Sequence, residues 1–103
     1  MKRKKYACNR LYIDNRYLSH AVVTINEDGE VGSYFSLYEE ISATEWIGGA
    51  IVLSDKKYEI KYSDFQDFKE KMTSAKQFLY AWHISNFDFQ KEEFTPQSII
   101  SRL

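Results

Sequence analysis

The spacing of apolar residues changes twice along this chain, from the period of a strand to that of a helix and back. Runs rich in β-branched and aromatic residues occupy 5–13, 17–25 and 31–38, and residues 50–53 are wholly apolar. Runs of the first kind predict strands, and a short wholly apolar run is expected of a strand covered on both faces. The first half of the chain therefore predicts a β sheet.

Two polar breaks join the first three runs. Residues 14–16 (Asp-Asn-Arg) fit a hairpin, and residues 26–30 contain Gly29, which can take the positive φ that a short hairpin loop requires. We expect these three strands to form an antiparallel meander.

A helical period follows, and it predicts one amphipathic helix over 64–76. Ser63 and Gln66 form a capping box at its start. Apolar residues then recur at spacings of three and four along one stripe: Phe65, Phe68, Met72, Ala75 and Leu79.

Alternation by two returns at residue 78 and predicts a strand over 78–84. One face of this strand would carry Phe78, Tyr80, Trp82 and Ile84, and the other Leu79, Ala81 and His83. Residues 98–103 close the chain, either as an edge strand or as a short helix with Thr95 as its cap and Pro96 at its first position.

Composition supports a small β-rich domain. The chain has 103 residues, of which 44% are hydrophobic and 17% aromatic, and its formal net charge is -1. This length allows one core, and the aromatic content favours strands over a helical bundle. We predict a single domain, 1–103, of the β-rich α+β class, with an antiparallel sheet or small sandwich and one principal helix. It should fold without a metal or a partner.

The sequence also indicates a compartment. Cys8 is the one cysteine, so no intramolecular disulfide forms and an oxidising compartment is not required. The basic residues 2–5 are followed by interruptions such as Asn9 and Arg10, not by the apolar run of a secretory signal. No segment approaches the roughly 20 apolar residues of a membrane span. We expect a cytoplasmic protein without membrane contact.

Two parts of the chain resemble a known family. The runs HAVVTI (20–25), NEDGEV (26–31) and WIGGAIVL (46–53) resemble the N-terminal β segment of metal-dependent amidohydrolases. The ending, with ISNFDF (84–89) and FTPQS (94–98), is similar to the C-terminal strands of some of these enzymes. In that family the two ends form a composite β domain beside a (β/α)8 barrel, which holds the metals. The resemblance implies that this chain is such a composite domain.

The chain departs from the family where the chemistry would begin. In the family the strand corresponding to 50–53 continues into a barrel strand with a His-x-His metal pair, whereas here Ser54-Asp55-Lys56-Lys57-Tyr58 follows. About thirty residues separate the two β segments, against the roughly 200 or more of a barrel. We expect a freestanding composite domain without hydrolase activity.

Other reactive arrangements are not indicated. Cys8, His20 and His83 lack the local spacing of a metal site, so a structural role is expected for each and no cofactor is predicted. Residues 48–49 (Gly-Gly) have no phosphate-loop context and are more typical of a bulge or a tight turn into a strand. The carboxylates fall in polar connections and form no general acid/base pair. We therefore predict that the protein is not an enzyme.

Five aromatic residues are candidates for an interface or a pocket: Tyr34, Tyr38, Phe78, Tyr80 and Trp82. Nucleic-acid binding is not expected, because these segments carry few cations beyond Lys76. We favour a non-catalytic module that associates with itself or with a protein partner. The alternative is a small-molecule-binding or accessory protein with an aromatic-lined pocket between sheet and helix. A homodimer is expected because runs 31–38 and 78–84 place apolar residues on both faces.

Overall fold

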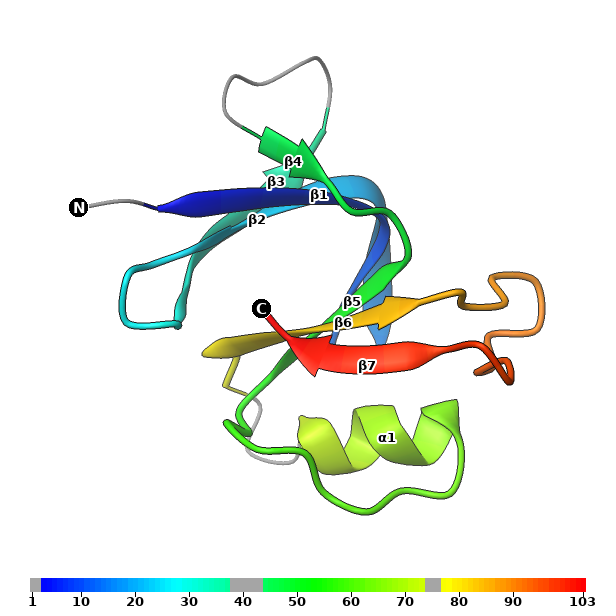
Figure 1. The fold of residues 1–103 in the computed structure, drawn as a ribbon. Coiled ribbons are helices and arrows are strands. Elements are labelled where there is room, and N and C mark those ends of the chain that lie inside the picture. The colour runs from blue at the N-terminus through cyan, green and yellow to red at the C-terminus, as the bar shows by residue number, and fades with distance from the viewer. Residues whose placement is uncertain (1–2, 38–43, 74–76) are drawn as a thin grey trace.

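The structure is a computed structural model, and it describes residues 3–37, 44–73 and 77–103. Within these ranges it contains seven strands and one helix, a β-rich α+β fold as the sequence predicts (Figure 1). The elements are β1 (Lys4–Ile13), β2 (Arg16–Ile25), β3 (Val31–Ser36), β4 (Thr44–Trp46), β5 (Ala50–Ser54), α1 (Phe65–Met72), β6 (Tyr80–Ser85) and β7 (Ile99–Arg102).

The strands form a mixed sheet in the order β3-β2-β1-β5-β6-β7, with β4 also paired to β1. The pairs β1–β2, β2–β3, β5–β6 and β6–β7 are antiparallel, as expected, but β4 and β5 both run parallel to β1. Side-chain patterns do not distinguish these two orientations. Of the two endings considered for the chain, the edge strand is the one observed.

The predicted meander of β1, β2 and β3 is confirmed. Asp14 takes a φ of 59° in the β1–β2 turn, and Gly29 takes 88° in the β2–β3 loop. That loop is closed by a hydrogen bond from Asn26 N to Glu30 O at 2.8 Å.

The long hairpin of β1 and β2 bends in its middle, between the pairs Cys8–Ala21 and Arg10–Ser19 (Figure 1). Cys8 and Leu11 belong to the same core cluster although strict alternation would place them on opposite faces, so the phase of β1 changes between them. The backbone at this point departs from a regular strand: His20 has a φ of 55°, and the N–H groups of both Asn9 and Arg10 donate to Gly49 O. The sheet curls here (Figure 1).

The curl separates two cores. The first lies within the concave side of the sheet and contains Cys8, Leu11, Ile13, Ala21, Val23, Ile25, Ile51, Leu53 and Ala81. The second lies between the sheet and α1 and contains Tyr12, Ala50, Val52, Phe65, Phe68, Met72, Trp82, Ile84 and Phe87. All five residues of β5 are buried between them, which confirms the strand covered on both faces.

The curl brings the edge strand β3 back toward β6. Val31 N donates to Leu79 O at 2.7 Å, immediately before β6 begins. Val31 and Phe78 both pack against the first core, whereas alternation predicted Phe78 on the face of Trp82 and Ile84, which belong to the second core. A bulge at Thr24/Ile25 shifts the phase of β3 by one residue, and Phe78 precedes the strand that was expected to include it.

Helix α1 begins one residue later than expected and is observed only as far as Met72. Its N-cap is Asp64, whose side chain accepts from Asp67 N, so the predicted Ser63–Gln66 capping box is wrong. Phe65, Phe68 and Met72 face the sheet as predicted. Residues 74–76, with Ala75, lie outside the described residues. Asp55 N donates to Met72 O at 3.1 Å and joins the helix end to β5. No helix in the described ranges is long and apolar enough to cross a membrane.

Candidate functional site

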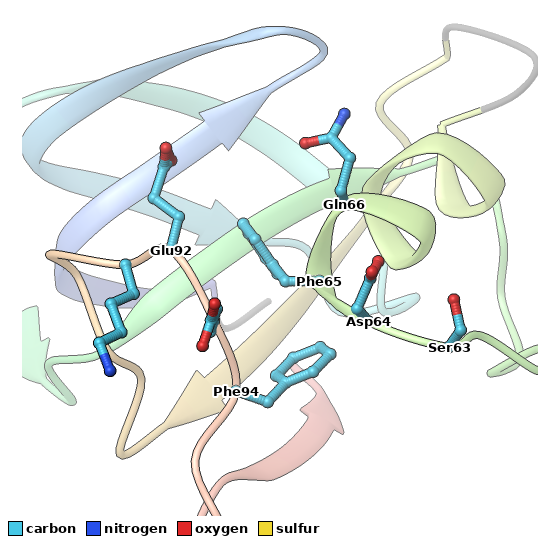
Figure 2. A pocket seen from close by; sticks show the side chains of 8 residues that line it. Ser63, Asp64, Phe65, Gln66, Glu92 and Phe94 are labelled. Carbon is cyan, nitrogen blue, oxygen red and sulfur yellow. The ribbon is translucent and has the colours of Figure 1, made fainter.

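A pocket of about 490 Å³ opens between the first turn of α1 and the segment that joins β6 to β7. Its lining combines polar and charged side chains with two phenylalanines: Ser63, Asp64, Phe65, Gln66, Lys91, Glu92, Glu93 and Phe94. Figure 2 shows Phe65 between Glu92 on the loop side and Gln66 and Asp64 on the helix side.

Carboxylates already occupy the helix side of the pocket. Asp64 Oδ1 accepts from Asp67 N at 2.8 Å, and Asp67 Oδ2 accepts from Ser63 N at 2.9 Å. The Ser63 N–H and the ion pair with Lys71 lower the pKa of Asp67 below its ordinary value. Because these carboxylates take up the positive end of the helix, this turn is a poor receptor for an anion.

The loop side of the pocket is fixed by a network from β1. The Tyr12 hydroxyl donates to Glu92 Oε2 at 2.8 Å, and Arg10 Nη1 donates to the Tyr12 hydroxyl at 3.1 Å. Arg10 also donates to Phe89 O at 3.3 Å, and its guanidinium lies 4.2 Å from the ring centroid of Tyr17. Burial raises the pKa of Tyr12 to about 12, so this phenol remains a donor and does not serve as a base or nucleophile near neutral pH.

Beneath the pocket lies a cluster of aromatic rings. The Phe65 ring is in edge contact with Phe87 at 4.5 Å and with Phe94 at 5.6 Å between centroids. Phe94 also contacts Phe68 at 5.8 Å. These contacts give the pocket an apolar base.

Cys8, His20 and His83 occupy separate environments. Cys8 is fully buried, and burial raises its pKa to about 12, which leaves the thiol unreactive. His83 Nε2 lies 3.1 Å from Gly48 O, and burial lowers its pKa. His20 stacks on Trp46. Within residues 3–37, 44–73 and 77–103, no three His, Cys, Asp or Glu side chains are arranged to hold a metal ion.

The four aromatic candidates that the structure describes do not gather in one place. Trp82 is 5% exposed in the core beneath α1, and its indole N–H donates to Lys56 O at 3.0 Å. Tyr80 is half-buried beside Arg102, and Phe78 packs against the first core. Tyr34 is exposed on the edge strand β3. Tyr38 lies outside the described residues, and none of the other four lines the pocket.

Sequence reasoning missed the residues that shape the pocket. Glu92 has a φ of 53°, a left-handed conformation that its residue type does not signal. Arg10 and Glu92 meet only because the sheet brings β1 beside the segment between β6 and β7. Two sequence features could have indicated this pocket: the two phenylalanines of FDF (87–89) and the isolated Phe94. Both are equally consistent with residues of the core.

A second surface feature lies at the opposite end of the molecule from α1 (Figure 1). Register places Trp46 beside Ala7, Ala7 beside Val22, and Val22 beside Phe35, so these side chains share one face of the sheet. Trp46 is 53% exposed and Phe35 is 37% exposed. The His20 ring stacks on Trp46 with centroids 6.3 Å apart. We call Phe35, Trp46 and His20 the aromatic face.

Comparison with protein-family models, with curated proteins and with solved structures gives no match. The resemblance to the composite β domain of amidohydrolases therefore stays a prediction from the runs that carry it.

Proposed function

We propose that this protein is a non-catalytic interaction module that associates with itself through the aromatic face. The observation that carries the proposal is the exposure of Trp46, at 53%, on the same sheet face as Phe35. Large aromatic side chains are enriched at interface centres, where one tryptophan can dominate the binding energy.

Trp46 and Phe35 offer exposed apolar surface for association, whereas β6 does not. The faces of β6 that were expected to need a partner are covered within the chain: Trp82 and Ile84 pack beneath α1, and Ala81 packs inside the curl. The part of the sheet formed by β3 and β4 lies away from α1 (Figure 1). A second copy, placed about a two-fold axis, is the commonest cover for such a face.

Sedimentation velocity over low to high micromolar concentrations tests the proposal. The wild type should change from the 12.2 kDa monomer toward a dimer as concentration rises. Trp46→Ser should raise the dissociation constant by about tenfold or more, because the loss of an interface tryptophan is among the costliest truncations. Tyr58→Ser is the matched control, since Tyr58 is 74% exposed and lies in the connection before α1.

A monomer at every concentration would refute self-association. Equal dissociation constants for the wild type and Trp46→Ser would refute the aromatic face as its site. Thermal unfolding of both variants establishes that any change in association is not a loss of fold.

A further inference from the structure

β3 is an edge strand whose outer side is open. It pairs with β2, and within residues 3–37, 44–73 and 77–103 no other strand pairs with it. At its start, Val31 N donates to Leu79 O at 2.7 Å. Beyond this contact residues 32–35 are exposed, so the backbone of the strand lies at the surface there.

The hydrogen-bond pattern of β3 identifies the free backbone groups. Leu37 N donates to His20 O at 2.7 Å, so residue 37 bonds to β2. Bonded and non-bonded pairs alternate along antiparallel strands, and every second residue of β3 before Leu37 therefore bonds to β2 as well. The N–H and C=O groups of Tyr34 and Ser36 lie between these and point away from β2. In the part of the chain that the structure describes, no backbone hydrogen bond reaches them.

This edge lacks the features that commonly keep sheet edges apart. Exposed edges are usually protected by a charged side chain, a proline, a bulge or a very short strand. Residues 31–37 contain no charged residue and no proline, and the bulge of β3 lies near its start. The edge strand β7 differs, because it has four residues and includes Arg102, which donates to Lys57 O at 3.2 Å.

We propose that β3 pairs with β3 of a second copy, antiparallel and about a two-fold axis, so that the two sheets join into one. With Phe35 on the axis, Tyr34 of each copy lies opposite Ser36 of the other, and such a pair exchanges N–H···O bonds in both directions. All the outward groups of these two residues are then bonded. The edge is uncharged, so the symmetry brings no like charges together.

The edge contact is separate from association through Trp46. Trp46 lies on β4, and β1 and β2 lie between β4 and β3, so pairing at the edge leaves Trp46 uncovered. The Phe35 side chains meet across the axis in a non-hydrogen-bonded pair, the closer of the two kinds. Because Tyr34 and Ser36 alone supply the bonds, this contact is weaker than one with a buried tryptophan and forms toward millimolar concentration. Together with the aromatic face, it extends assembly beyond the dimer.

Amide hydrogen exchange, followed by NMR, tests the pairing in Trp46→Ser, which removes the exposed tryptophan of the aromatic face. The amides of Tyr34 and Ser36 should exchange more slowly at millimolar than at micromolar concentration. The amides of residues 33 and 35 already bond to β2, so their exchange should change little. This alternation is specific to strand pairing, because packing of one sheet face on another supplies no partner for the Tyr34 and Ser36 amides.

Tyr34→Pro, in the same Trp46→Ser background, removes one outward N–H and no bond to β2. Proline is tolerated on edge strands where its nitrogen faces solvent. The dissociation constant of the edge contact, measured by sedimentation equilibrium, should rise by about tenfold or more, because symmetry removes the bond from both copies. Tyr34→Thr is the matched control: it keeps the N–H and suits a strand, so the constant should stay nearly unchanged.

The inference is overturned if Trp46→Ser stays monomeric at millimolar concentration, or if the Tyr34 and Ser36 amides exchange equally fast at both concentrations. Dimers of the wild type that depend on Trp46 would then keep the proposed function and exclude edge pairing. Conversely, alternating protection in a protein whose association does not depend on Trp46 would support edge pairing and refute the aromatic face. Should Tyr34→Pro fail to fold, the exchange pattern of Trp46→Ser decides.

Discussion

The Trp82 indole nitrogen donates a hydrogen bond to the Lys56 carbonyl oxygen at 3.0 Å, which joins β6 to the connection that leads to α1. The ring itself packs among the residues beneath α1. Trp82 is therefore a core residue with a satisfied polar group, and its role is to hold the helix connection against the sheet.

Trp82→Ala should lower the free energy of unfolding by about 3–5 kcal/mol, the usual cost of truncating a buried tryptophan. Urea unfolding followed by circular dichroism measures the loss. Tyr58→Ala is the control: the side chain is 74% exposed and lies outside the aromatic face, so the change in stability should stay within about 0.5 kcal/mol. Equal losses for the two variants would contradict the assignment of Trp82 to the core.

Gly49→Ala tests the turn at which β5 begins. Gly49 has a φ of 66°, and an added Cβ would overlap Ile84 O and lie 3.0 Å from His83 Nε2. Backbone strain and steric overlap should both destabilise the folded protein, so we expect a loss of more than about 2 kcal/mol in the free energy of unfolding.

Gly29→Ala separates the two causes. Gly29 has a φ of 88° but nothing within 4 Å of an added Cβ, so only the backbone cost of about 1 kcal/mol applies. If Gly49→Ala costs no more than Gly29→Ala, the close approach of β6 to Gly49 does not constrain that site.

The helix α1 shows which structural features the sequence predicts and which it does not. The stripe of Phe65, Phe68 and Met72 predicts the helix and its buried face, because packing enforces that spacing. Its first residue depends on whether Ser63 or Asp64 supplies the cap, and both are good capping residues. Capping preference alone therefore does not distinguish Ser63 from Asp64. In the structure, the hydrogen bond from Asp67 N to Asp64 Oδ1 identifies Asp64 as the cap.

The sheet shows a second kind of feature that the sequence does not predict, namely which strands pair. Runs rich in β-branched and aromatic residues predict the three strands of the meander, but they do not predict the change of phase in β1 or the bulge between β2 and β3. The pairing of β1 with β4 and β5 is set by contacts between segments about forty residues apart, and the three-residue strand β4 is too short to carry a pattern. The pocket lies beyond sequence reasoning for the same reason: Arg10, Tyr12 and Glu92 converge only after the sheet has formed.

Asp64→Ala should lower the free energy of unfolding by about 1 kcal/mol, because it leaves the Asp67 N–H without its side-chain acceptor. Ser63→Ala should cost less, since it removes only the 3.3 Å contact of an exposed hydroxyl with Asp67 Oδ2. Denaturant unfolding of the two variants compares them. A larger loss for Ser63→Ala would instead indicate that Ser63 is the cap, as the sequence predicted.

His83 makes stability depend on pH near neutrality. Burial lowers its pKa below 6.5, the ordinary value for histidine, so the folded protein binds this proton less readily than the unfolded chain does. The contribution of neutral His83 to the free energy of unfolding is complete above about pH 7.5. The free energy of unfolding falls as pH drops through about 6.5 toward the lowered pKa, because protonation favours the unfolded state.

His83→Gln removes the titration and keeps an amide that can donate to Gly48 O. The difference in unfolding free energy between wild type and His83→Gln should be constant at high pH and should move against the wild type between about pH 7 and pH 5. Carboxylates titrate in both proteins, so the difference isolates the imidazole. A difference that stays flat across this range, or that moves in favour of the wild type on acidification, would show that the folded protein does not disfavour the protonated ring.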